Sequence, residues 1–417
     1  MSETLRRIVL GNRNGHITSI PSVCSAHPDV LRASLRLAEE LDREIVVEST
    51  SNQVNQDGGY TGMRPADFKD LVYASANAAG ADADRIVLGG DHLGPQAWRK
   101  QGAEFAMAKA REMVAEYVQA GFGKIHLDCS AGCGDEPEQL ADDVTAARSA
   151  ELAAICLENS AAGEMSFVIG TEVPPPGGAL LNEDGEIVAT TPQSARTTLE
   201  AHELAFKAHG IEAAMPLVQG LVVQPGLEFS PMQVHHLPLD RDPHFKDVAM
   251  SWPCLCLEAH STDYQNPEVF PRLAQLGFAF QKVGPALTFA WREAIYSLDM
   301  LRYLAGWGEP VVFPAMEKIM VADSGYWKGH YRGTEEELHI QRHFSYADRI
   351  RYYWPQEGAQ NAVQFLIDDL QTRHAPTPML AQLFSEEIIE RADRIPAPWP
   401  IAIVEAKVQS ALAPYFF

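Results

Sequence analysis

Eight short apolar segments, separated by longer stretches with helical periodicity, constrain the fold of this chain more than any other feature. Each is bounded by Gly, Pro, Asn or Asp, as expected of a strand covered on both faces. The segments are Ile17–Ser25, Glu44–Thr50, Arg85–His92, Lys124–Ser130, Ser166–Glu172, Leu221–Gly226, Cys254–His260 and Phe278–Gly284. This alternation predicts an α/β fold, a parallel (β/α)8 TIM barrel. An open doubly wound sheet is the alternative, but no Gly-x-Gly-x-x-Gly motif follows any of the segments.

The alternation ends near Gly306. Beyond it the chain contains apolar helical stretches such as Gln360–Leu370 and Pro378–Ala392, but no further buried strand. We therefore predict a barrel over residues 1–306 and a helical C-terminal extension over residues 307–417 that packs on it. An Asn-Glu-Asp-Gly turn signal predicts a surface loop over Asn182–Thr191.

The charge balance excludes several classes of partner. The chain has 33 Lys and Arg against 56 Asp and Glu, a net charge of −23. Such a field repels phosphate backbones and anionic lipid, so we expect no nucleic acid and no membrane as partner. The sequence has no apolar run of the about 18 residues that a membrane span needs. Six cysteines in 417 residues are too few for a disulfide framework, which predicts reduced thiols and a cytoplasmic location.

Polar side chains gather near the ends of seven of the eight predicted strands. In a (β/α)8 barrel the carboxyl ends of the strands surround the active site, so these residues are expected to converge on one pocket. The set comprises Glu48, Asp91, His92, His126, Asp128, Glu172, Gln224, Glu258, His260 and Lys282. Strand parity supports this, because Glu258 and His260 share a face opposite the apolar residues Leu257 and Ala259. Cys254 and Cys256 lie on the same polar face and are expected to be small interior filler rather than metal ligands.

His92, Glu172 and His260 are the predicted metal ligands. Two imidazoles and a carboxylate suit a divalent ion that acts as a Lewis acid, with Zn²⁺ or Mn²⁺ favoured. The three residues come from alternate strands, which contribute to one interior layer, so their ligand atoms should lie within about 5 Å of one another. Asp128 is either a further ligand or a residue that orients one. The alternative for each histidine is a hydrogen-bonded interior residue.

Asp91 is the predicted acid–base residue. It precedes His92 and points away from it in an ideal strand, but bending at the strand end before Leu93-Gly94-Pro95 can return it to the mouth of the barrel. Substrate contacts are predicted from an amide-rich loop that contains Asn52, Gln53, Asn55 and Gln56, which suits a polyhydroxylated molecule. A solvated loop is the alternative.

The segment Asp348–Trp354 couples two arginines to three aromatic residues. Arg349 or Arg351 is a candidate phosphate clamp because the guanidinium is a planar fork of donors. The alternative is an amphipathic helix in which one arginine pairs with Asp348.

These motifs resemble the GatZ/KbaZ family, which is associated with class II D-tagatose-1,6-bisphosphate aldolase. The matching stretches cover nearly the whole chain and include Val23–Pro28 (VCSAHP), Glu48–Asp67 (ESTSNQVNQDGGYTGMRPAD), Gly89–Pro95 (GGDHLGP), Ile169–Pro174 (IGTEVP), Glu258–Gln265 (EAHSTDYQ), Lys282–Phe289 (KVGPALTF) and Ser345–Pro355 (SYADRIRYYWP). The resemblance implies a phosphorylated ketohexose as substrate and a class II aldolase catalytic subunit as a partner. It leaves homo-oligomer formation open.

Three activities are attached to the family that the chain resembles. One is 4-epimerisation of D-tagatose 6-phosphate, another is an accessory role beside the aldolase subunit, and the third is a tagatose-6-phosphate kinase. A kinase is disfavoured because the sequence has no Gly-x-x-x-x-Gly-Lys-Ser/Thr loop. We expect an epimerase that uses retro-aldol chemistry, with Asp91 or Glu48 moving the proton of the carbon-4 hydroxyl. Lys282 is expected to neutralise developing negative charge, and a Schiff base on Lys282 is the alternative.

Overall fold

The structure is a computed structural model that describes residues 3–160, 165–170, 187 and 189–417. Glu172 and most of the predicted loop Asn182–Thr191 lie outside these residues. In the described part of the chain, no helix combines the length and the apolar character needed to cross a bilayer.

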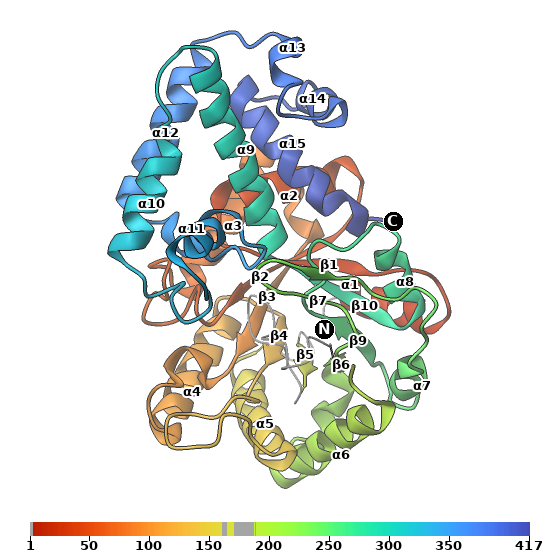
Figure 1. The fold of residues 1–417 in the computed structure, drawn as a ribbon. Helices are drawn as coiled ribbons and strands as arrows, with labels where there is room; N and C mark the ends of the chain where they lie inside the picture. The colour runs from red at the N-terminus through yellow and green to blue at the C-terminus, as the bar shows by residue number, and fades with distance from the viewer. Residues whose placement is uncertain (1–2, 161–164, 171–186, 188) are drawn as a thin grey trace.

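Eight parallel strands close into a barrel, as the sequence predicts (Figure 1). The strands are β1 (Ile20–Cys24), β2 (Ile45–Thr50), β3 (Ile86–Leu93), β4 (Lys124–Leu127), β5 (Ser166–Ile169), β6 (Val218–Val222), β9 (Cys256–Ala259) and β10 (Phe278–Val283). Each matches one predicted segment, although β6 begins and ends earlier than expected. A two-stranded hairpin of β7 (Glu228–Phe229) and β8 (Val234–His235) follows β6.

A helix follows every barrel strand and covers the outside of the barrel. These helices are α2 (Pro28–Glu40), α3 (Pro65–Ala79), α4 (Ala103–Gln119), α5 (Asp142–Asn159), α6 (Pro192–Ala208), α7 (Phe245–Met250), α8 (Val269–Gln275) and α9 (Pro285–Leu304). In α4 the buried side chains recur at helical spacing from Ala106 to Val118, and this stripe faces the sheet. The amphipathic pattern therefore fixes which face of the helix is buried.

The amino-terminal end of the barrel is closed by apolar packing. Helix α1 (Glu3–Arg13) inserts Leu5, Ile8 and Val9 into a cluster with inward-facing strand residues that include Val46 and Phe280. Full burial of one such side chain contributes about 1.5–3 kcal/mol. The opposite end of the barrel is left open for polar groups.

Residues after α9 form a helical extension. It consists of α10 (Val312–Ala322), α11 (Glu335–Phe344), the 3-10 helix η4 (Arg349–Tyr353), α12 (Glu357–Gln371), α13 (Thr377–Leu380), α14 (Glu386–Ala392) and α15 (Trp399–Leu412). Helix α15 packs against α9 and α2 (Figure 1). The helix predicted over Pro378–Ala392 is divided into α13 and α14, because the chain turns before Ser385, a residue type favoured at helix N-termini. The boundary at residue 306 stays a prediction.

Candidate active site

The end of β3 brings two consecutive side chains into the barrel mouth. His92 has φ of 48°, in the left-handed region that non-glycine residues rarely adopt. The pairing of β3 with β4 shifts register between Gly90 and Leu93 at the same place. This break in strand alternation lets Asp91 and His92 both line the pocket. The expected bend therefore exists, and His92 is the residue that absorbs it.

Buried charges of alternating sign lie beneath the pocket. Lys124 Nζ is 2.6 Å from Glu48 Oε1 and 2.6 Å from Glu258 Oε2, and all three side chains are fully buried. Above them Lys282 Nζ is 3.2 Å from Glu48 Oε2 and 3.3 Å from Glu258 Oε1. Lys282 also forms an ion pair with Asp91. We call Lys124, Glu48, Glu258, Lys282 and Asp91 the floor network.

The floor network holds Asp91 and Lys282 ionised. Burial opposes charge on Asp91, but His92, Lys282 and His126 outweigh it and hold the pKa of Asp91 well below its usual range. Burial likewise opposes charge on Lys282, and Asp91, Glu258 and Glu48 together raise its pKa well above the ordinary value. Lys282 is therefore an ammonium, which argues against the Schiff-base alternative.

Three imidazoles cluster beside Asp91. The ring centroids lie 4.9 Å apart for His92 and His126, 5.1 Å for His126 and His260, and 5.2 Å for His92 and His260. Burial and the Lys282 charge lower the pKa of His126 and lower that of His260 to about 3. Burial opposes charge on His92 too, but Asp91 and Asp128 raise its pKa. His126 and His260 are thus neutral imidazoles, the form that binds metal.

Carboxylates orient the three rings. Asp128 Oδ2 lies 2.7 Å from His92 Nδ1, Asp91 Oδ1 lies 2.9 Å from His126 Nδ1, and Glu258 Oε1 lies 2.9 Å from His260 Nε2. His126 Nε2 is buried and has no hydrogen-bond partner among the described residues. An unsatisfied buried nitrogen in a cluster of imidazoles and carboxylates fits a divalent cation.

Two overlapping groups in the cluster have ligand atoms within 4.8 Å of one another. They are Asp91, His92 and His126, and His126, Glu258 and His260. Both groups contain His126, whereas His92 belongs only to the first and His260 only to the second. Asp91 lies beside His92 in the first group, and a single ion shared by His92 and His260 stays a prediction. Asp128 contacts His92 and also accepts a 2.7 Å hydrogen bond from Ser130 Oγ, so its position is that of a residue orienting a ligand.

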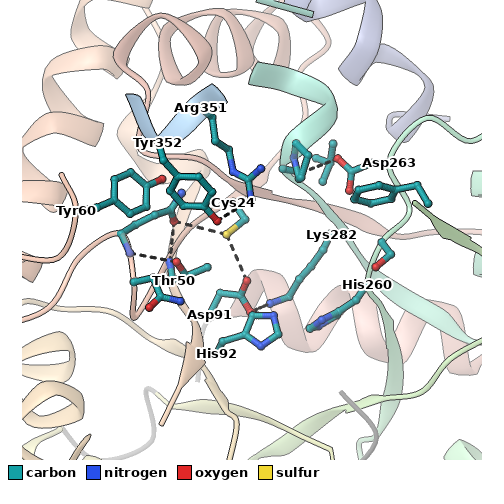
Figure 2. Close-up of a pocket in the computed structure, with 17 residues that line it drawn as sticks. Cys24, Thr50, Tyr60, Asp91, His92, His260, Asp263, Lys282, Arg351 and Tyr352 are labelled. Carbon is teal, nitrogen blue, oxygen red and sulfur yellow. Dashed lines mark hydrogen bonds and ion pairs between the residues drawn. The ribbon is translucent and has the colours of Figure 1, made fainter. Parts of the chain in front are cut away.

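The opposite wall of the pocket comes from the C-terminal extension and the β2–α3 loop. Arg351, Tyr352 and Tyr60 lie along this side, facing Asp91, His92 and Lys282 (Figure 2). Arg351 Nη1 donates to the carbonyls of Ala347 and Asp348, and Nη2 donates to the Tyr352 hydroxyl. We call Tyr60, Arg351 and Tyr352 the roof.

Other predicted substrate contacts divide into two groups. Asn52 and Gln53 line the pocket. Four others do not line it, because their polar atoms form hydrogen bonds with backbone groups. These are Asn55, Gln56, Gln224 and Arg349. Asn55 and Gln224 close their own loops by bonding to nearby backbone, Gln56 Nε2 donates to the Lys109 carbonyl, and Arg349 Nε donates to the Tyr326 carbonyl.

The alternative prediction for Arg349 and Arg351, an ion pair of one of them with Asp348, is also wrong. Asp348 pairs with Arg292, at 3.1 Å, and not with a neighbouring guanidinium. Cys256 packs in the barrel interior as expected, and all six cysteines are free. The site residues without a predicted role are Lys124, His126, Glu258, Cys24 and Tyr352. Parity already placed Glu258 and His126 inward, and Lys124 lies on the face of His126 by the same rule.

The fold and the site together define a barrel protein with a buried imidazole–carboxylate centre at the carboxyl ends of its strands, where barrel enzymes carry their active sites. A family model described as D-tagatose-1,6-bisphosphate aldolase subunit GatZ/KbaZ-like matches residues 5–417, and the chain belongs to this family.

One solved structure agrees with that assignment. The chain is similar to a Sinorhizobium meliloti 1021 protein named a probable tagatose 6 phosphate kinase, with 40% identity over 95% of this chain and 99% of that one and a TM-score of 0.87. The YdjI aldolase from Escherichia coli K12 is 12% identical, over 87% of this chain and 94% of that one, with a TM-score of 0.42. We draw no functional argument from a match at that level.

Proposed function

We propose that this chain is a metal-dependent enzyme that interconverts D-tagatose 6-phosphate and D-fructose 6-phosphate by retro-aldol cleavage and re-addition. The observation that carries the proposal is the site itself: one chain supplies three clustered imidazoles, an ionised Asp91 and the Lys282 ammonium. A purely structural barrel has no need of such a costly set of buried charges.

His92, His126 and His260 are the proposed metal-holding residues, with Asp91 or Glu258 as a carboxylate beside them. Glu172, which lies outside the described residues, stays in the proposed set as a predicted ligand, and Asp128 is assigned to orienting His92. A bound Zn²⁺ or Mn²⁺ would supply Lewis-acid polarisation of the substrate's ketone. The four carboxylates Asp91, Asp128, Glu48 and Glu258 outnumber the ammoniums of Lys124 and Lys282. A bound divalent cation would offset this negative charge.

The chain's own residues account for the proton transfer and the charge. Asp91 is a carboxylate that lines the pocket, so it is the base for the carbon-4 hydroxyl. Glu48, the other predicted base, is fully buried between two lysines and serves to hold Lys282. Lys282 lies where negative charge develops on the ketone side.

Arg351 is the proposed phosphate contact. Its side-chain hydrogen bonds to the described residues use Nη1 and Nη2 and leave Nε available. It lies across the pocket from the floor network (Figure 2). A ketohexose phosphate would then span the pocket with its ketone at the floor and its phosphate at the roof.

The test uses the purified chain alone, loaded with Mn²⁺ or Zn²⁺ and incubated with D-tagatose 6-phosphate. We expect D-fructose 6-phosphate, and His92→Ala should abolish its formation. If neither fructose 6-phosphate nor triose products form, the catalytic proposal is wrong. Metal titration should show binding to the apo protein and loss of that binding in His260→Ala.

The family description favours a second candidate, an accessory subunit of a class II tagatose-bisphosphate aldolase. That role predicts a stable complex with the catalytic subunit and aldolase activity that survives His92→Ala in this chain. Activity of the isolated chain that depends on His92 would decide for the enzyme.

A further inference from the structure

The roof contains a tyrosine held between two arginines. The guanidinium carbons of Arg349 and Arg351 lie 4.8 and 4.5 Å from the ring centroid of Tyr352. Arg351 Nη2 donates a 2.9 Å hydrogen bond to the Tyr352 hydroxyl oxygen. The ring also packs edge-on against Tyr60, with centroids 4.8 Å apart, and stacks on Tyr326 at 5.2 Å. These contacts fix the ring and surround its oxygen with positive charge.

This environment separates Tyr352 from the tyrosines beside it. Burial opposes ionisation of Tyr352, but Arg351 and Arg349 outweigh it and lower its pKa from the ordinary 10. Burial instead raises the pKa of Tyr60 and of Tyr326. Tyr352 therefore releases its proton more readily than its neighbours do, and the two guanidiniums stabilise the phenolate that is left.

Inversion at carbon 4 requires proton transfer on two sides of the substrate. This step of the argument rests on the proposed epimerase function. When the aldehyde rotates before re-addition, the carbon-4 oxygen moves from one side of the carbon chain to the other. A group placed to take the hydroxyl proton of one epimer is then out of reach of the other. Asp91 and Tyr352 lie on opposite sides of the pocket (Figure 2).

We propose that Tyr352 is the second acid–base residue of this site. Asp91 takes the carbon-4 hydroxyl proton of one epimer, the bond between carbons 3 and 4 breaks, and its electron pair passes into an enediolate over carbons 2 and 3. Carbon 3 then re-forms the bond on the other face of the aldehyde, and the aldehyde oxygen takes the Tyr352 proton. The proton on Asp91 returns to the phenolate through solvent. Neither a net proton nor another reactant is consumed.

The test compares Tyr352→Phe with Tyr326→Phe, a matched control that alters the same aromatic cluster outside the pocket lining. In Tyr352→Phe, kcat for epimerisation should fall about 10²–10⁴-fold, the range of a lost acid–base group, with little change in KM. Retro-aldol cleavage to trioses should persist from the epimer that Asp91 deprotonates and be lost from the other. Tyr326→Phe should keep both.

Two further measurements keep the result interpretable. Mn²⁺ binding should be unchanged in Tyr352→Phe, which shows that the variant folds. An ultraviolet titration should show one tyrosinate forming at lower pH than the rest in the wild type and in Tyr326→Phe, but not in Tyr352→Phe.

Different results would overturn the proposal for Tyr352 and the proposed function. A rise in KM with kcat unchanged would make Tyr352 a phosphate contact and overturn the proposal, as would an equal loss of cleavage from both epimers. If the wild-type chain interconverts nothing, the proposed function itself fails, and the inference about Tyr352 falls with it.

Discussion

The floor network and the roof face the same pocket but are built in opposite ways. The floor network stands on barrel strands, is almost fully excluded from solvent, and balances each charge against a neighbour of opposite sign. The roof comes from a 3-10 segment and a loop, and its charge is the guanidinium of Arg351, which flanks Tyr352 together with Arg349. Closed β-structure therefore holds the proposed catalytic groups, while the helical extension brings the positive charge of Arg351 to the pocket.

This difference predicts where the molecule is fragile. In the floor network every ammonium neutralises carboxylates that are themselves out of water. Removing one partner leaves an uncompensated buried charge. Removing an exposed lysine of the extension leaves no buried carboxylate without its counter-ion.

Lys124→Met should give the largest effect. It leaves Glu48 and Glu258 without the ammonium that lies 2.6 Å from each. Breaking a buried pair in this way costs about 3–5 kcal/mol, so we expect that loss in the free energy of unfolding from urea denaturation. Activity should fall as well, because Glu48 and Glu258 position Lys282.

The control for Lys124→Met is Lys318→Met on α10, an exposed position in the extension. Its effect should lie within about 0.5 kcal/mol. Equal effects of the two variants would show that the floor network is not the electrostatic core of the fold.

The floor was more predictable from the sequence than the roof, and the reason is periodicity. Strand residues alternate between two faces, so Glu258 and His260 could be placed inward from letters alone. The same rule places Lys124 inward, but this residue begins its strand and so lies outside the polar set predicted at the strand ends. His92 has a left-handed backbone conformation, which breaks the alternation of side chains along the strand. The sequence therefore indicates a bend at this strand end but not the residue that makes it.

The roof has no comparable rule. Arg349 and Arg351 stand two residues apart in a 3-10 helix, and only the packing of Tyr326, Tyr60 and Tyr352 decides which of them faces the pocket. The amide-rich loop shows the same limit. Asn55 and Gln56 have the chemistry of substrate contacts, but they satisfy backbone groups instead.

Asp263 tests whether neighbouring cations keep Asp91 and Glu258 ionised against the effect of burial. It lines the pocket and accepts hydrogen bonds from Gly284 N and Ala286 N at the start of α9. Burial raises its pKa from 3.8 to about 6. The folded chain therefore binds this proton more tightly than the unfolded chain does, and stability should fall as pH rises from about 4 to about 6, by about 3 kcal/mol in total.

Asp263→Asn removes this titration and keeps an acceptor for the two backbone groups. The stability of the variant minus that of the wild type should rise through that pH window and be flat above it. The exposed Asp240→Asn serves as the control and should show no such rise. A difference that falls with pH would mean that Asp263 behaves like Asp91 and Glu258, whose pKa values are lowered.

Gly89→Ala probes the same contrast through packing. Gly89 pairs with Glu48 across β2 and β3. A Cβ at residue 89 would lie 2.8 Å from Glu48 Cγ and 2.9 Å from its Oε1. Because Glu48 is clamped by Lys124 and Lys282, it cannot swing away, and overpacking of this kind typically costs about 1–3 kcal/mol. Thermal unfolding measures this loss.

The matched change in the extension is Gly329→Ala. The added Cβ meets nothing within 4 Å, so this variant should be neutral or slightly stabilising. If Gly89→Ala were as stable as Gly329→Ala, Glu48 would have room to move, and the floor network would be as adaptable as the roof. A displaced Glu48 should also lower kcat more than it raises KM, since it disturbs Lys282 and leaves Arg351 in place.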